Sequence, residues 1–319
     1  MQLTINKLNK SFGSKHVLKD LSFTAGSGGA TGLLGRNGSG KTTTIRTIMG
    51  IFPADSGTSL IDGVPSQSMR ARIGYLPEER GLYPKRLIGD QMAYIGELRG
   101  LTHKVAKERA KNLLIRLEAE EYFDKKLDTL SKGNQQKIQL AIALITEPDI
   151  VILDEPFSGL DPVNSQILKR MVEELVAEGK LVLFSSHEMG YVEEFCDDIC
   201  IIDHGQIVLD GKIRDIKAKY PRHQILVTPE TPGADALRGQ LLQLDAVSKL
   251  AAGIEAQGRG CLVTLHNERD KTALFSALTG SGIAIDAISV VEPSLEDIFV
   301  EKVGKEAVAE DEMEGGEVA

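Results

Sequence analysis

Apolar residues in the first two thirds of the chain form short runs that alternate with longer amphipathic segments. The runs are rich in Val, Ile and Leu, as in buried strands, and they occur in QLTINKL, ATGLLG, DIVILDEP, KLVLFSS and DICIID. Helical patterns separate them at residues 41–50, 102–120, 132–146 and 162–179. Strands that alternate with helices in this way predict an α/β domain, in which helices cover a parallel sheet.

Two parts of the chain depart from this alternation. Residues 90–130 are helical and charged, which indicates a helical insertion into the α/β domain. HGQIVLDG, at 204–211, is typical of a closing hairpin, and the following AKYPRHQ breaks the pattern. The runs QILVT, CLVTLH and AIDAISVVEP then alternate with helical pieces and predict a small α+β domain. We therefore expect domains at 1–219, with a helical subdomain at about 80–135, and at 220–304.

The charge of the chain is concentrated near its C-terminal end. Residues from 220 on hold 8 of the 37 Lys and Arg residues but 17 of the 46 Asp and Glu residues, which accounts for the net charge of −9. The end of the chain, EAVAEDEMEGGEVA, predicts a disordered acidic tail at 305–319. No basic stripe is present to neutralise phosphates, so we expect no nucleic-acid partner.

Neither a membrane span nor a disulfide framework is expected. The longest uncharged stretch, 21–35, is rich in glycine and shorter than the roughly 18 apolar residues that a span needs. The N-terminus, MQLTINKLNK, is no signal peptide. Cys196 and Cys200 could bind a metal, but no second pair of Cys or His lies near them in the sequence. We interpret them, with Cys261, as buried thiols in a reducing cytosol.

The segment GRNGSGKT, at 35–42, fits the phosphate-binding pattern G-x-x-x-x-G-K-[ST]. It follows a strand and opens a helix, so its glycines let backbone N–H groups surround a phosphate at the helix N-terminus. The lysine can reach the β- and γ-phosphates, and the threonine hydroxyl can ligate Mg²⁺. The residues expected to bind the nucleotide here are Gly35, Arg36, Asn37, Gly38, Ser39, Gly40, Lys41, Thr42 and Thr43.

Three further segments carry candidate chemistry. IVILDEP ends a strand in Asp154, which could hold Mg²⁺, and Glu155, which could orient the attacking water. LFSSHE places His187 beyond another strand, where it could contact a phosphate, although a lone histidine is more often structural. LSKGNQQK, at 130–137, predicts a helix with a serine cap. By itself this helix start is either a solvent-facing cap or a phosphate contact.

Six motifs in one order make the chain resemble the nucleotide-binding subunits of ATP-binding cassette (ABC) transporters over about residues 1–215. GRNGSGKT resembles the Walker A loop and IVILDEP the Walker B strand. LSKGN resembles the LSGGQ signature, SGLD at 158–161 the D-loop, and His187 the switch histidine. Phe12, in KSFG, occupies the place of the aromatic residue that stacks on adenine in this family.

This resemblance implies a P-loop NTPase cassette, with a mixed sheet and a helical subdomain, that binds ATP and Mg²⁺ and hydrolyses ATP. In such a cassette Lys41 contacts the phosphates, Glu155 acts as the base or orients the water, and His187 senses the γ-phosphate. The metal would be held by Thr42, Asp154 and Glu78.

The resemblance also implies a dimer, either a homodimer or a pair with a second cassette subunit. The signature helix of one subunit faces the ATP on the Walker A loop of the other. Ser131 would then offer its hydroxyl, Gly133 would allow close approach of the backbone, and Asp161 of the D-loop would belong to the same nucleotide site. The start of the signature helix is therefore interpreted as a phosphate contact.

A subunit of this kind powers transport through a separate integral-membrane permease and lies in the cytoplasm, peripheral on the inner face of the cell membrane. The C-terminal domain, which ends PSLEDIFVEKVG, resembles the extension on cassette ATPases of bacterial sodium and drug efflux systems. That second resemblance favours export.

The chain departs from the family pattern at four positions, of which Arg36, where proline is common, should be benign. Lys132 and Asn134 alter the signature, and Glu78 stands where the family usually has a glutamine that touches Mg²⁺ and senses the membrane subunit. These changes leave open a regulatory module without hydrolysis, against which the intact Glu155 and His187 argue. A cassette ATPase of translation or DNA repair is the other alternative. The single cassette and the absence of a coiled-coil pattern or basic patch argue against it.

Overall fold

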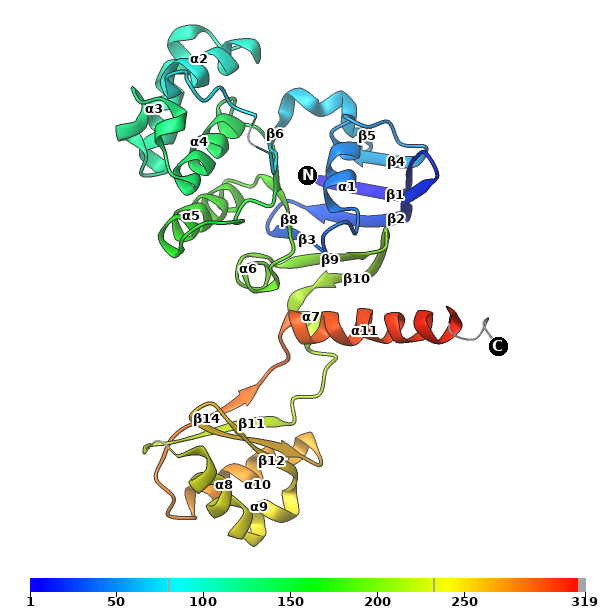
Figure 1. Ribbon diagram of the computed structural model, residues 1–319, viewed down its shortest axis with the longest axis vertical. Coiled ribbons are helices and arrows are strands. Elements are labelled where there is room, and N and C mark those ends of the chain that lie inside the picture. Colours follow the sequence, from blue (N-terminus) through cyan, green and yellow to red (C-terminus); the bar gives the residue numbers. More distant parts are fainter. Residues whose placement is uncertain (80, 232, 315–319) are drawn as a thin grey trace. The chain divides into compact units, whose positions relative to one another are not determined.

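A computed structural model describes residues 1–79, 81–231 and 233–314 of the protein. A six-stranded sheet, in the order β10-β9-β3-β8-β7-β6, forms the centre of the first part of the chain (Figure 1). Its strands are β3 (Ala30–Leu34), β6 (Ile73–Leu76), β7 (Ile150–Asp154), β8 (Leu181–Ser186), β9 (Asp198–Asp203) and β10 (Gln206–Lys212). All neighbours are parallel except β9 and β10. The predicted α/β fold is thereby confirmed.

A second, antiparallel sheet of order β2-β1-β4-β5 packs into the same core. It consists of β1 (Gln2–Phe12), β2 (Lys15–Gly26), β4 (Ser56–Ile61) and β5 (Val64–Pro65). Leu3 and Phe23 from this sheet share a hydrophobic cluster with Leu33, Ile152 and Leu183 of the parallel sheet. The sequence pattern predicted β1 alone among these four strands.

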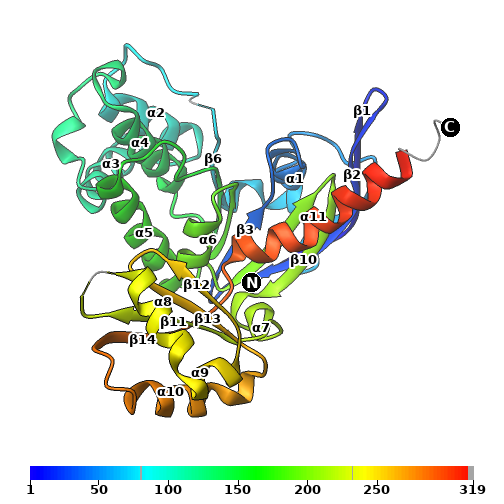
Figure 2. The same cartoon turned by 60° about the horizontal axis from the view of Figure 1, so that its bottom comes forward.

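The helices α2 (Ile88–Leu98), α3 (His103–Arg116) and α4 (Lys132–Leu144) gather beside the edge strand β6 (Figures 1 and 2). Short 3₁₀ turns at Glu120–Tyr122 and Leu127–Thr129 connect α3 to α4, and another, Ser66–Arg72, precedes β6. The remaining helices of this part are α1 (Lys41–Ile48), α5 (Pro162–Ala177), α6 (Met189–Phe195) and α7 (Ile213–Lys217). The residues interpreted as a helical insertion thus contain α2 and α3 and no strand.

A compact α+β unit spans Arg214–Ile298. Its antiparallel strands β11 (Gln224–Pro229), β12 (Ala251–Gln257), β13 (Gly260–Leu265) and β14 (Ile285–Val291) have the order β12-β13-β11-β14. Helices α8 (Ala234–Gln243), α9 (Asp245–Leu250) and α10 (Lys271–Thr279), the last preceded by a 3₁₀ turn at Glu268–Asp270, pack on one face of this sheet (Figure 1). The domain boundaries expected from the sequence, after residues 219 and 304, lie a few residues further along the chain and stay predictions.

The last helix, α11 (Leu295–Glu314), extends helical backbone into the segment expected to be a disordered tail. Ser294 and Asp297 form a capping box, in which the Ser294 hydroxyl donates to Asp297 Oδ2 at 2.6 Å and accepts from the Asp297 N–H at 3.1 Å. Phe299 and Val303, four residues apart, are buried on one face, as in an amphipathic helix. The expected disorder of residues 305–319 stays a prediction, and 315–319 lie outside the described residues.

The compact unit that contains the six-stranded sheet comprises Met1–Ile213 together with the chain from Phe299 on. Within the ranges that the structure describes, no helix combines the length and the apolar character needed to cross a membrane.

Gly74, in β6, allows α4 to lie directly against the edge of the sheet. A Cβ atom at this position would lie 2.5 Å from the carbonyl oxygen of Ala143 and 2.7 Å from Cγ of Pro148. The backbone of α4 would have to move to relieve these contacts. Because α4 begins at the signature segment, Gly74 helps to set the position of that segment.

We expect Gly74→Ala to lower the free energy of unfolding by about 1–3 kcal/mol, the usual cost of overpacking. The control is Gly190→Ala in α6, where an added Cβ has no neighbour within 4 Å. Chemical denaturation of both variants tests the expectation, and equal stabilities would contradict it.

Candidate functional site

The loop between β3 and α1 has the backbone of a phosphate-binding loop. Gly38 and Gly40 have φ angles of 83° and 118°, in the left-handed region that favours glycine. Gly40 is the N-cap of α1, and no side chain caps this helix. The N–H groups of the first turn therefore have no capping side chain to compete with an anion.

Lys41, Glu155 and His187 come from three different segments and meet beside this loop. Lys41 Nζ donates to the Gly35 carbonyl at 2.8 Å and lies 3.3 Å from Glu155 Oε1. The other Glu155 oxygen, Oε2, lies 2.8 Å from Nδ1 of His187. Lys41 and Glu155 are buried, and Glu155 adopts a φ of 50°, which is strained for a residue with a side chain. The three residues expected to be catalytic thus form one cluster.

Asp154, at the end of β7, is fully buried and points toward the start of α1. Its Oδ1 accepts hydrogen bonds from Thr42 Oγ1 at 3.3 Å and from Ser185 Oγ at 2.6 Å. Its Oδ2 has no hydrogen-bond partner among the described residues. Burial raises the pKa of Asp154, and the negative charge of Glu78 raises it further. A buried carboxylate oxygen without a partner, next to a threonine hydroxyl, fits a Mg²⁺ site.

A pocket of about 230 Å³ opens in front of these groups. It is lined by Val17, Asn37, Gly38, Gly40, Lys41, Thr42, Thr43, Glu78 and Glu155. Of the nine residues at 35–43 that were expected to bind the nucleotide, six are in this lining. Three are not: Gly35 accepts from Lys41, Ser39 is buried, and the Arg36 guanidinium lies 5.6 Å from the ring centroid of Phe299. Val17 was not predicted, because an isolated valine in a strand carries no chemical signal.

Phe12, at the end of β1, is 44% exposed and does not line the pocket. Its ring packs edge-on against Phe52, with 5.1 Å between the ring centroids. Its expected stacking on adenine stays a prediction.

The signature residues form a second cluster with the D-loop. Ser131 caps α4, and its Oγ accepts from the Asn134 N–H at 3.4 Å. Asp161 caps α5 by accepting from the Asn164 N–H at 3.0 Å and from Asn164 Nδ2 at 2.6 Å. These hydrogen bonds lower the pKa of Asp161. An added Cβ on Gly133 would lie 2.7 Å from Asn164 Nδ2, so the two helix starts touch. None of these residues lines the pocket at the phosphate loop.

The altered signature residues have distinct surroundings. Asn134 Nδ2 donates to the hydroxyl of Tyr122 at 2.9 Å, whereas Lys132 is exposed. Tyr122 was not predicted as part of this cluster. It lies twelve residues before Asn134, in a 3₁₀ turn, and the sequence offers no signal for the pairing.

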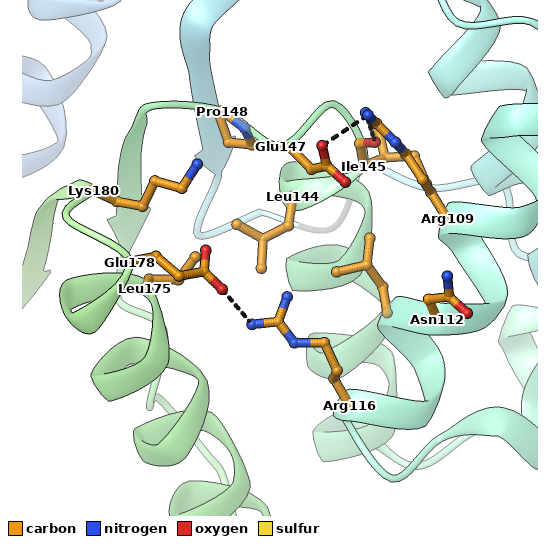
Figure 3. Close-up of a pocket in the computed structure, with 11 residues that line it drawn as sticks. Arg109, Asn112, Arg116, Leu144, Ile145, Glu147, Pro148, Leu175, Glu178 and Lys180 are labelled. Carbon is orange, nitrogen blue, oxygen red and sulfur yellow. Dashed lines mark hydrogen bonds and ion pairs between the residues drawn. The ribbon is translucent and has the colours of Figure 1, made fainter.

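A separate hollow between α3, the end of α4 and the end of α5 contains none of the expected site residues (Figure 3). Arg109 Nη2 lies 2.8 Å from Glu147 Oε2 on one side of it, and Arg116 Nη2 lies 3.1 Å from Glu178 Oε1 on the other. Arg116 also contacts Glu174 at 2.8 Å. The two ion pairs of Arg116 connect α3 to the end of α5, and the pair of Arg109 connects α3 to the loop after α4.

Comparison with known proteins gives two family matches. The model described as "ABC transporter" matches residues 18–158, and the model described as "ATP-binding protein DrrA1-3-like, C-terminal domain" matches residues 211–303. An uncharacterized ABC transporter ATP-binding protein, YhaQ of Bacillus subtilis, is 40% identical over 308 residues, which cover 95% of this chain and 98% of the relative. The linearmycin resistance ATP-binding protein LnrL, from the same organism, is 31% identical over 307 residues, with the same two coverages.

The solved structure of an ATP binding subunit of an ABC transporter superposes with a TM-score of 0.63 at 29% identity. The similarity covers 69% of this chain and 93% of that structure.

Ser185, in β8, joins the two carboxylate residues and was missed in the sequence. Its Oγ donates to Asp154 Oδ1 at 2.6 Å and accepts from the backbone N–H of Glu155 at 3.0 Å. The available signal was its position two residues before His187, at the end of a buried strand.

We expect Ser185→Ala to lower the free energy of unfolding by about 1–3 kcal/mol, because a buried oxygen and a buried N–H each lose a partner. Ser59→Ala is the matched control. The buried Ser59 Oγ has no hydrogen-bond partner among the described residues, so its loss should cost about 1 kcal/mol or less. Urea denaturation compares the two variants, and the prediction fails when Ser185→Ala is no less stable than Ser59→Ala.

Proposed function

This chain belongs to the ABC transporter ATP-binding proteins, and from that premise we propose that it hydrolyses Mg-ATP at the interface of two cassettes and powers export through a separate permease. The observation that carries this proposal is the cluster of Lys41, Glu155 and His187 next to the phosphate loop. It supplies a cation for phosphate, a carboxylate for water and a group that orients the carboxylate.

ATP would bind with its phosphates at the N-terminus of α1 and at Lys41. The metal would be held by Thr42, Asp154 and Glu78, which the Thr42–Asp154 hydrogen bond and the partnerless Asp154 oxygen support. Bound Mg²⁺ would neutralise charge on the β- and γ-phosphates.

Glu155 would accept the proton of the attacking water. In the present arrangement Lys41 occupies Glu155 Oε1 and His187 occupies Oε2. A γ-phosphate that attracts Lys41 leaves Oε1 able to accept a proton, while His187 keeps the carboxylate in place. Arrival of the phosphate and activation of the base are thereby linked through one ion pair.

The second cluster, formed by Ser131, Gly133 and Asp161, would complete the site of the other subunit. The support for this is positional: Gly133 and Asp161 both contact Asn164, and none of the three residues lines the pocket of its own chain. The N-terminus of α4 would direct its partial positive charge at the γ-phosphate. Two ATP molecules would then lie at the interface of a homodimer, or of a pair with a second cassette subunit.

We place the contact with the permease at the start of α2. A hollow there is lined by Tyr83, Arg86, Asp90, Gln91 and Tyr94. The buried Gln91 amide fixes its rim by accepting from the Tyr83 N–H at 2.9 Å and donating to the Arg86 carbonyl at 3.0 Å. Tyr83 and Tyr94 are 60% and 53% exposed, and exposed tyrosines are typical of binding surfaces. The protein would therefore lie on the inner face of the membrane.

Export is supported by the names of the relatives. LnrL is a linearmycin resistance protein, other relatives are named Nod factor export proteins, and the C-terminal family is DrrA-like.

We expect Glu155→Gln to convert from monomer to dimer when ATP is added, because the bound ATP is not hydrolysed and keeps the interface closed. Light scattering coupled to size exclusion measures the change. The double variant Glu155→Gln/Gly133→Asp is the control, since a carboxylate at the signature should repel the partner's γ-phosphate and leave a monomer that still binds ATP. ATP bound by Glu155→Gln without dimer formation would contradict the proposed interface.

We expect Tyr83→Ala/Tyr94→Ala to reduce recovery of the protein in the membrane fraction of its native host, at unchanged ATPase activity of the isolated subunit. Ile115→Ala is the control, because this α3 side chain is 59% exposed but lies outside the hollow. Membrane recovery that is equal for all three proteins would exclude this docking site.

A further inference from the structure

We propose that Glu78 makes nucleotide binding conditional on a divalent cation, so that the pocket accepts the metal–ATP complex and rejects metal-free ATP. The proposal rests on the proposed function of this pocket as an ATP site, and it adds the form of the nucleotide that the pocket selects.

The first argument is the balance of charge around the pocket. Lys41 is the one lysine or arginine among its lining residues, whereas Glu78 and Glu155 are both in the lining. Asp154 adds a third carboxylate behind Thr42. One cation therefore faces three carboxylates, and it is already paired with Glu155 at 3.3 Å.

The nearby arginines do not neutralise this excess of negative charge at the pocket. The Arg36 guanidinium lies over the ring of Phe299, and Arg46 Nη2 lies 3.9 Å from Glu79 Oε1. Neither residue lines the pocket. A triphosphate that arrives without a metal thus depends on Lys41, the loop amides and the α1 N-terminus against an excess of negative side chains.

The second argument is that Glu78 differs from the other carboxylates near it. Glu155 pairs with Lys41 and His187, and Glu79 pairs with Arg46. Within the described parts of the chain, Glu78 has no hydrogen bond or ion pair, although it lines the pocket. Glu78 lines the same pocket as Thr42, whose hydroxyl donates to Asp154, so its charge lies near the expected metal position.

These observations give Glu78 opposite effects on the two forms of the nucleotide. A carboxylate repels the phosphates of metal-free ATP, and it attracts a divalent cation that those phosphates carry. A glutamine amide at this position would have no net charge and would distinguish the two forms less. Glu78 therefore acts as a specificity-determining residue for the metal complex.

The test measures the dissociation constant of the β,γ-imido analogue of ATP by calorimetry, once with Mg²⁺ and once with EDTA. In Glu78→Gln we expect binding in EDTA to become tighter by about three- to tenfold, as removal of one nearby charge predicts. Binding with Mg²⁺ should become weaker. The ratio of the dissociation constant in EDTA to the dissociation constant with Mg²⁺ should therefore fall. Glu78→Asp separates the effect of the charge from that of the side-chain length. This variant keeps the charge, so it should still bind weakly in EDTA, but its shorter side chain should lower the affinity with Mg²⁺.

Glu79→Gln is the matched control. It removes the same charge one residue further along, from a side chain that faces Arg46 outside the pocket, and its ratio should equal that of the wild type. A ratio unchanged in Glu78→Gln, with nucleotide binding intact, would overturn the inference and leave the proposed function standing. An equal fall in Glu79→Gln would also overturn it, since the effect would then be one of overall charge. Wild-type protein that binds no nucleotide even with Mg²⁺ would refute the proposed function and this inference together.

Discussion

The arrangement of the site depends on one buried ion pair, between Lys41 and Glu155. A buried charge without a partner is expensive, so each of these residues constrains where the other can lie. Lys41 begins α1 and Glu155 follows β7, while His187, which contacts Glu155, follows β8. The pair therefore ties the phosphate loop to the ends of two neighbouring strands, and an anion that competes for Lys41 acts on all three segments at once.

The sequence predicted the residues that belong to short sequence motifs, and it missed those whose role depends on packing in the folded chain. The phosphate loop, the strand that ends in Asp154 and the helix capped by Ser131 all follow from short patterns. Val17 and Tyr122 could not be found, because a valine or a tyrosine acquires its role only from the segments that fold against it. Ser185 was missed although its position before His187, at the end of a buried strand, offered a signal. The strands β4 and β5 were missed because they are short and mostly exposed, so their apolar pattern is weak. The strand β2 was missed although Leu21, Phe23 and Ala25 alternate with exposed residues, as in a half-buried strand.

The pairing of Asn134 with Tyr122 shows how the chain accommodates its altered signature. A shorter amide than glutamine has less reach, and in this protein the Tyr122 hydroxyl lies within hydrogen-bond distance of it. The start of α4 is thus held from two sides, by the Ser131 cap within the helix and by a side chain from the preceding 3₁₀ turn. The Asn134 amide therefore has a partner within its own chain.

The path of the chain connects the C-terminal α+β unit to the ATP-binding unit at both of its ends. The chain leaves the ATP-binding unit after Ile213 and rejoins it at Phe299, so the α+β unit is an inserted domain anchored at both ends rather than an appendage. Its two anchor points restrict the conformations open to it, in the way that closing a loop does. Removal of everything after residue 213 would also strip Phe299 and Val303 from the ATP-binding unit. A single cut of the chain therefore cannot separate the two units.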